Sequence, residues 1–138
     1  MDIILAPDVY VNASVAPGTP PDRVVQRVLG QHKGQSKASE WVLSRVEAIL
    51  GAIPAFKHEA VQQQMQLIRS YVKVLPGLGD FAADAWQKAL VANAKAAGAH
   101  RVVTDHPDLL AAEAAEGIDF ISSETWLLEE TTPPPVPG

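Results

Sequence analysis

Carboxylates follow two short apolar segments that lie far apart in the chain. Asp8 comes directly after Ile3-Ile4-Leu5-Ala6-Pro7, and both Asp105 and Asp108 come after Arg101-Val102-Val103-Thr104. Carboxylate oxygens are the ligands that Mg²⁺ and Mn²⁺ prefer, and such an ion can orient a water molecule for attack on a phosphodiester. The same residues could instead serve the fold, with Asp8 in a turn or helix cap and Asp105 or Asp108 capping a helix.

Hydrophobic periodicity predicts strands that alternate with helices. Short apolar runs predict strands at residues 2–6, 101–104 and 120–122. Helical spacing and capping residues predict helices at residues 20–29, 40–50, 58–74, 81–97, 108–116 and 123–128. This alternation favours a three-layer α/β/α sandwich around a short, mostly parallel central sheet. Ligands of such sheets bind beyond the carboxyl ends of the strands, so Asp8 and Asp105 are expected to meet in one cleft.

Some boundaries are better marked than others. Ser39 precedes a helical pattern as an N-cap, either Ser122 or Ser123 can cap the last helix, and Gly98 suits a left-handed C-cap. Residues 9–15 fit either the end of a strand or a first helical turn.

The composition fits one globular domain, at residues 1–130, followed by a Pro-rich tail at residues 131–138. The chain has 138 residues and no cysteine, which excludes disulfides and thiolate metal sites. Its formal net charge of −5 counts against a dedicated nucleic-acid binder. No apolar run approaches the roughly 18 residues of a membrane span, and no secretory signal is visible. We therefore expect a cytoplasmic protein that does not bind membranes.

The order of these segments resembles the PIN-domain family, whose members are mostly metal-dependent ribonucleases. The resemblance covers nearly all of residues 2–130. Its residues are Ala6-Pro7-Asp8-Val9-Tyr10, Ser39-Glu40-Trp41-Val42-Leu43-Ser44-Arg45, Val103-Thr104-Asp105-His106-Pro107-Asp108-Leu109 and the closing Gly117-Ile118. A PIN-like fold is implied, and with it a site at the carboxyl edge of the sheet.

The resemblance places no acid at the four positions where PIN nucleases hold one or two Mg²⁺ or Mn²⁺ ions. Those positions fall on Ala6, Arg45, Gln87 and His106. A cationic side chain such as Arg45 would be unfavourable beside a metal ion. The resemblance therefore implies a PIN-like protein that is non-catalytic or impaired as a nuclease, that needs no cofactor, and that acts by binding protein or RNA.

An alternative keeps the chemistry but displaces the acids. Asp8, Asp84, Asp105 and Asp108 each lie within three residues of one of those four positions. They would form a shifted Mg²⁺ or Mn²⁺ site of a divergent ribonuclease of the toxin–antitoxin type. One or two carboxylates would then hold the metal, and another would orient the attacking water.

Other side chains near the expected cleft suit binding. Tyr10 and Asn12 follow the first strand, where a tyrosine could stack on a base or contact a protein, although it could also pack against the sheet. Arg45 could bind phosphate, and His106 could bind a transition metal or simply face solvent. PIN domains commonly pair, and many serve in toxin–antitoxin modules. The resemblance therefore implies, as partners, a second copy of the chain in a homodimer, a cognate antitoxin, or RNA.

Overall fold

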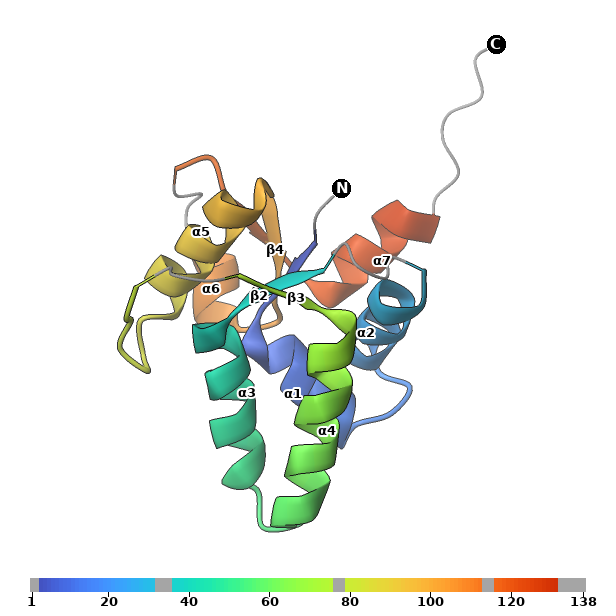
Figure 1. Ribbon diagram of the computed structural model, residues 1–138. Coiled ribbons are helices and arrows are strands. Elements are labelled where there is room, and N and C mark those ends of the chain that lie inside the picture. The colour runs from blue at the N-terminus through green and yellow to red at the C-terminus, as the bar shows by residue number, and fades with distance from the viewer. Residues whose placement is uncertain (1–2, 32–35, 76–78, 113–115, 132–138) are drawn as a thin grey trace.

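Helices and short strands alternate along the chain (Figure 1). The computed structural model describes residues 3–31, 36–75, 79–112 and 116–131. Its elements are β1 (Ile4–Leu5), α1 (Pro7–Val15), α2 (Pro20–Gln31), β2 (Lys37–Ser39), α3 (Glu40–Gly51), α4 (His58–Tyr71), β3 (Lys73–Leu75), α5 (Trp86–Ala97), β4 (Arg101–Val103), α6 (Pro107–Ala111), β5 (Asp119–Ile121) and α7 (Ser123–Thr131). Within these ranges, no helix has the length and apolar character that crossing a membrane requires.

All strand pairs in the described part of the chain are parallel. β4 lies between β1 and β5, with Val102 opposite Ile4 on one side and Phe120 on the other, and β2 pairs with β3. A parallel bridge between Ile3 and Ser36 joins the two sets, so the strands follow the order β3-β2-β1-β4-β5. The order reverses between β1 and β4, and ligands of parallel sheets bind beyond the carboxyl ends of the strands at such a reversal.

Helices cover the sheet on two sides. From left to right in Figure 1, α5 and α6 come first, then the strands, then α2 and α7. α5 contacts β1, β2, β3 and β4, while α2 packs against α1 and α7. The predicted three-layer architecture is therefore confirmed.

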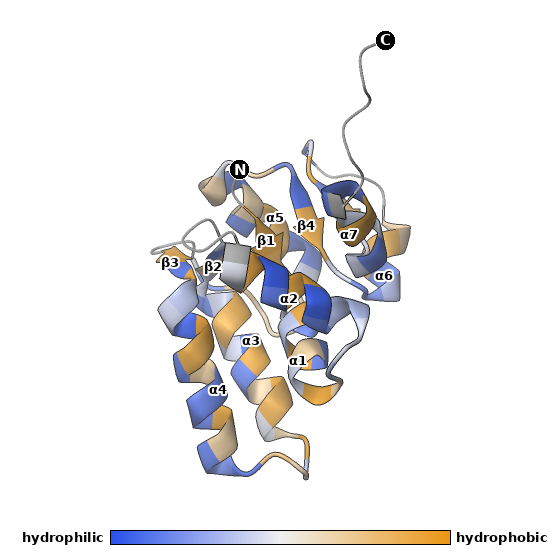
Figure 2. Cartoon of the chain, turned by 90° about the vertical axis from the view of Figure 1, so that its right-hand side faces the viewer, coloured by the Kyte–Doolittle hydropathy of each residue, from blue (hydrophilic) through white to orange (hydrophobic). Residues whose placement is uncertain are grey.

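A helical hairpin of α3 and α4 extends below the sheet, and α1 packs against α3 (Figure 1). Apolar and polar residues alternate along α4 in Figure 2, and its apolar residues Val61, Met65 and Ile68 are buried in the main core. These residues therefore serve the core of the monomer.

Three capping predictions are confirmed. The Ser39 Oγ accepts a hydrogen bond from the Val42 N–H at 3.3 Å, and the Ser122 Oγ accepts one from the Thr125 N–H at 3.1 Å. Gly98 ends α5 with φ at 72°, a left-handed conformation that a side chain would disfavour.

Two short strands, β2 and β3, are missing from the predicted elements. The helix predicted at residues 58–74 ends at Tyr71, because the next residues join the sheet through a hydrogen bond from the Lys73 N–H to the Ser36 carbonyl at 2.9 Å. Both strands are only three residues long and each begins with lysine, so their sequences carry little of the period-two pattern. Pairing with a neighbouring strand, rather than the local sequence, therefore determines that these segments are extended.

The other boundary errors concern helix ends. α5 begins at Trp86 and not at residue 81, and the Ala82 carbonyl accepts a hydrogen bond from the Trp41 Nε1–H at 3.0 Å. α7 continues to Thr131, the first residue of the predicted tail, and residues 132–138 lie outside the described part of the chain. Residues 9–15, left open by the sequence, are helical in α1.

Candidate functional site

The carboxyl ends of β1 and β4 lie side by side, as the sequence predicts. The Ala6 N–H donates to the Val103 carbonyl at 2.9 Å, so the chain leaves the sheet immediately after this pairing. Ala6 is the N-cap of α1 and has no side-chain capping bond, and Pro7 starts the helix. A proline suits this place because the first helical N–H has no partner within the helix. Asp8 is thereby placed in the first turn of α1, beside the carboxyl ends of β1 and β4.

Asp8 joins α1 to the end of β4. Its Oδ1 accepts a hydrogen bond from the Thr104 Oγ1–H at 2.8 Å, and its Oδ2 accepts one from the Asp105 N–H at 2.8 Å. Burial raises the pKa of the Asp8 carboxyl, and the nearby Asp105 carboxylate raises it further, although the two hydrogen bonds oppose the change. This carboxylate is therefore engaged on both oxygens by its own fold.

Asp105 performs a similar task for the last helix. Its Oδ1 accepts from the Ser123 N–H at 2.9 Å and its Oδ2 accepts from the Ser123 Oγ–H at 2.6 Å. Ser123 is buried and is the first residue of α7. Thr104 completes the connection, because its Oγ1 also accepts from the His106 N–H at 3.1 Å. A continuous set of hydrogen bonds thus holds α1, the end of β4 and the start of α7 together.

The structure brings only two of the four acids of the shifted-site hypothesis into this set. Asp84 is exposed in the segment before α5, and Asp108 is exposed in the first turn of α6. Among the described residues, no group of three or more histidine, aspartate or glutamate side chains has an arrangement that could hold a metal ion. Asp8 and Asp105 both accept hydrogen bonds from the chain, and among the described residues no hydrogen bond joins the Asp84 or Asp108 side chain to this set.

A row of aromatic rings lies where the resemblance places the metal-binding acids. The Trp41 and Trp86 rings are 5.9 Å apart in an edge-to-face arrangement, and the Trp86 and His106 rings are 5.3 Å apart. All three side chains are half-buried. Neither tryptophan was among the residues that the sequence predicted for the site. The sequence did contain a signal for this row. Trp41 lies one helical turn before Arg45, Trp86 is adjacent to Gln87, and His106 is itself one of the four positions.

His106 contributes to the next helix through its imidazole ring. Its Nδ1 accepts a hydrogen bond from the Asp108 N–H at 3.2 Å and so caps α6. An accepting Nδ1 assigns the proton of the neutral ring to Nε2. His106 is therefore a helix cap that keeps one N–H donor uncommitted.

Arg45 borders a small polar cavity of about 260 Å³ at the end of this row. The cavity is lined by Glu40, Trp41, Ser44, Arg45, residues 79–81 and Ala83. The Arg45 side chain is partly buried, and within the described ranges it forms no ion pair or hydrogen bond. Glu40 differs, because Arg69 holds both of its oxygens, at 2.9 and 3.1 Å.

The remaining predicted binding residues lie elsewhere. Tyr10 is buried in the core with its Oη 3.4 Å from the Ser36 Oγ, and burial raises its pKa to about 12. Its ring therefore packs inside the protein and is not presented to a ligand. Asn12 is exposed on α1.

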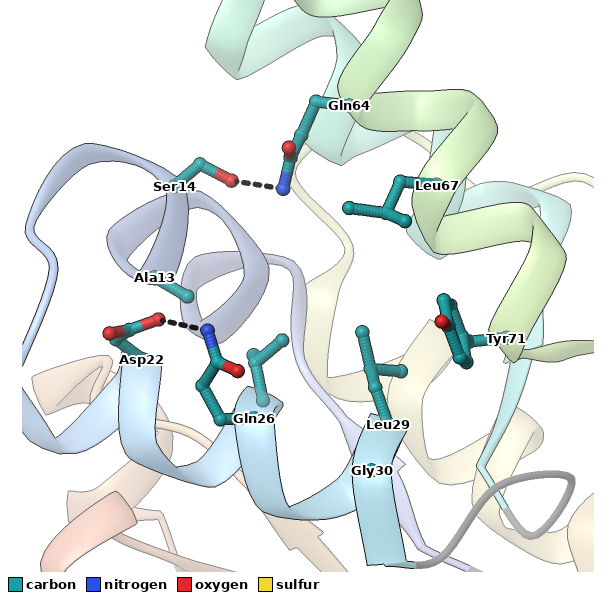
Figure 3. Close-up of a pocket in the computed structure, with 10 residues that line it drawn as sticks. Ala13, Ser14, Asp22, Gln26, Leu29, Gly30, Gln64, Leu67 and Tyr71 are labelled. Carbon is teal, nitrogen blue, oxygen red and sulfur yellow. Dashed lines mark hydrogen bonds between the residues drawn. The ribbon is translucent and has the colours of Figure 1, made fainter.

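A second and larger concavity separates α1, α2 and α4 (Figure 3). Its volume is about 630 Å³, and it is lined by Ala13, Ser14, Asp22, Val25, Gln26, Leu29, Gly30, Gln64, Leu67 and Tyr71. We refer to it as the α1/α2/α4 groove. The Gln64 Nε2–H donates to the Ser14 Oγ at 3.0 Å across one end, and Leu67, Leu29 and Tyr71 face the open space (Figure 3). Leu67 is 49% exposed, so its side chain is accessible from the groove.

Comparison with solved structures finds a similar chain in the crystal structure of VapBC2 from Rickettsia felis bound to a DNA fragment from their promoter. The TM-score is 0.64 at 12% sequence identity, and the match covers 88% of this chain and 98% of that chain. No protein-family model matches the sequence, and no curated protein is similar to it in sequence. At this identity the likeness concerns the fold, and the predicted PIN-like α/β fold is confirmed.

Proposed function

We propose that this protein is a PIN-like binding protein that does not cleave RNA through a metal centre, and that its partner is another protein. The absence of metal-dependent cleavage is proposed from the hydrogen bonding of Asp8 and Asp105, the two acids at the strand ends. All four carboxylate oxygens of Asp8 and Asp105 accept hydrogen bonds from the chain itself. A metal-binding carboxylate must direct oxygens toward a common ion, together with those of other acids. No cofactor is required by this proposal.

The α1/α2/α4 groove supports the second half. It combines apolar side chains, including Leu29 and Leu67, with polar groups at its edges, including Asp22 and Gln26. An amphipathic helix binds such a groove by placing its apolar face inside and its polar residues along the rim. The structural neighbour VapBC2, together with the PIN resemblance, favours a cognate antitoxin as the partner.

The first prediction concerns RNA cleavage. With Mn²⁺ present, the wild-type protein and the Asp8→Asn variant are expected to cleave single-stranded RNA equally and no faster than a buffer control. The reason is that both Asp8 carboxylate oxygens accept hydrogen bonds from the chain, which supports a role for Asp8 in the fold. The measurement is a time course with a fluorescently labelled RNA, with and without EDTA. Cleavage that requires Mn²⁺ and is lost in Asp8→Asn would favour the divergent ribonuclease instead.

The second prediction concerns the partner. Leu67→Glu is expected to weaken binding of the proposed antitoxin partner by about tenfold or more, because it places a charge on an apolar side chain that lines the groove. Affinity is measured by isothermal titration calorimetry after co-expression and separation of the two proteins.

Leu128→Glu is the matched control for this experiment. It changes a leucine that is 66% exposed on α7, away from the groove, and it is expected to bind like the wild type. Equal affinities for both variants would exclude the groove as the interface.

A further inference from the structure

Hydrogen-bond donors replace acids along the cleft. Of the four positions that the resemblance pairs with metal-binding carboxylates, Arg45, Gln87 and His106 carry N–H groups, and Ala6 is buried. The His106 Nε2–H is left uncommitted by the α6 cap, and Arg45 has no bonded partner in the described part of the chain. A site built to hold cations needs acceptors, whereas one lined by donors attracts anions. Arg45 and the His106 Nε2–H are therefore donors that suit an anion rather than a metal ion.

The aromatic rings give this cleft a second property. Trp41 and Trp86 are only half-buried, and they connect the Arg45 cavity with His106 through ring contacts at 5.9 and 5.3 Å. Trp41 and Arg45 lie four residues apart on α3, so they share one face of the helix. Exposed aromatic faces stack on nucleobases with little dependence on sequence. The row therefore offers a cation for an anionic group and, beside it, rings for a planar one.

We propose that this row binds a nucleotide without a metal ion, with the phosphate beside Arg45 and the base against Trp41 and Trp86. A guanidinium presents several N–H groups in one plane and pairs with two phosphate oxygens at once. The Arg45 cavity, at about 260 Å³, is slightly smaller than the range of about 300–1,000 Å³ for whole-ligand pockets. It therefore accommodates the phosphate end, and the base lies outside it, along the rings.

Carboxylates around the cavity are compatible with this ligand. Glu40 is neutralised by Arg69, whose two N–H groups hold both of its oxygens. Asp80 is exposed at the rim and has no ion pair with Arg45. A phosphate would supply the counter-ion that the partly buried guanidinium lacks. Asp80 opposes binding at long range, so Asp80→Asn is expected to strengthen it.

The start of α5 adds to the attraction. Trp86, the central ring of the row, is the first residue of this twelve-residue helix, and its N-cap, Ala85, makes no side-chain capping bond. The first N–H groups of a helix carry partial positive charge and remain free when no side chain caps them. They lie at the row, where the ligand would bind.

The experiment measures binding to the full chain in EDTA by isothermal titration calorimetry. The probes are adenosine 5′-monophosphate, adenosine, inorganic phosphate and a short 5′-phosphorylated single-stranded RNA. Arg45→Met is expected to lower the affinity for the nucleotide probes by about tenfold to a hundredfold, the range that hydrogen bonds to charged groups contribute. Arg45→Lys keeps the charge without the planar fork and is expected to be intermediate. Trp86→Leu removes the central ring and is expected to lower the affinity for the nucleotide probes about fivefold or more.

Arg27→Met is the matched control, because Arg27 is also partly buried on a helix and has no bonded partner in the described ranges. It is expected to bind like the wild type, and circular dichroism checks that each variant is folded. Binding by adenosine monophosphate identifies a free nucleotide as a ligand. If only the RNA binds, and Arg45→Met abolishes that binding, the ligand is a nucleotide that forms part of an RNA strand.

Two outcomes would overturn the proposal: no binding of either nucleotide probe to the wild type, or binding that Arg45→Met leaves unchanged. The inference rests on the proposed absence of a metal centre, but the two fail separately. Loss of nucleotide binding in EDTA leaves the partner-binding function intact. RNA cleavage that depends on Mn²⁺ and Asp8 would instead overturn the proposed function, whatever Arg45 does in EDTA.

Discussion

Replacing Leu90 with alanine is expected to lower the free energy of unfolding by about 2–5 kcal/mol, the usual range for a fully buried leucine. Leu90 is completely buried on α5, the helix that packs along four of the five strands in the described sheet. Its removal leaves a cavity that a rigid sheet closes only in part, and the lost contacts add to the lost apolar burial. Urea denaturation followed by circular dichroism measures the change.

Leu128→Ala is the control for this prediction. Leu128 is 66% exposed on α7, and its replacement is expected to change the free energy of unfolding by no more than about 0.5 kcal/mol. Similar losses in the two variants would mean that α5 does not lie on the sheet as described. Leu90 lies in neither of the proposed binding surfaces, so its replacement is expected to change stability without directly removing a binding contact.

The second large effect is expected at Asp105. Asp105→Ala should lower the free energy of unfolding by about 2–4 kcal/mol, because it leaves the Ser123 N–H and hydroxyl, both of which it binds, without their charged acceptor. Ser123 is buried, so water replaces the carboxylate only if the start of α7 opens. Urea denaturation again measures the loss, and amide hydrogen exchange shows whether α7 is the region that opens.

Asp108→Ala provides the comparison, since Asp108 is exposed in the first turn of α6, three residues after Asp105, and its side chain has no bonded partner in the described ranges. We expect its effect to stay within about 0.5 kcal/mol. If Mn²⁺ stabilised the wild type but not Asp105→Ala, then Asp105 would be a metal ligand, and its assignment as the anchor of α7 would be wrong.

Much of the fold follows from the sequence because its strongest local signals agree with the tertiary structure. The apolar runs before Asp8 and Asp105 are strands, Ser39 and Gly98 cap helices, and the strands are parallel. β2 and β3 were missed because strands of only three residues obtain their geometry from pairing with a neighbour, and β-propensity depends strongly on context. The early start predicted for α5 failed for a related reason: alanine favours helix, but the bond from Trp41 to the Ala82 carbonyl is tertiary.

The site was harder to predict than the fold. The sequence indicates that Asp8 and Asp105 approach each other, and they do. It does not indicate what their oxygens bind, because Thr104 and Ser123 become donors only through the arrangement of β4 and α7. The contact between Trp86 and His106 likewise joins side chains from two elements, and no spacing along the chain encodes it. Side-chain type is local information, whereas the partner of a polar atom is set by packing.

The strand order has a consequence for how the chain reaches this structure. β1 is made first, yet its sheet partner β4 begins at Arg101, and in the described part it meets β2 only through the bridge between Ile3 and Ser36. The hydrogen bond of Asp8 likewise cannot form before its donor Thr104 is made, 96 residues later. Loop-closure entropy must be overcome before such distant pairs gain anything, so folding is slow for a chain of this length. During synthesis the first strand therefore lacks its partner β4, and presents an apolar edge on that side, until residues 101–103 have left the ribosome, a stage at which such edges aggregate or recruit chaperones.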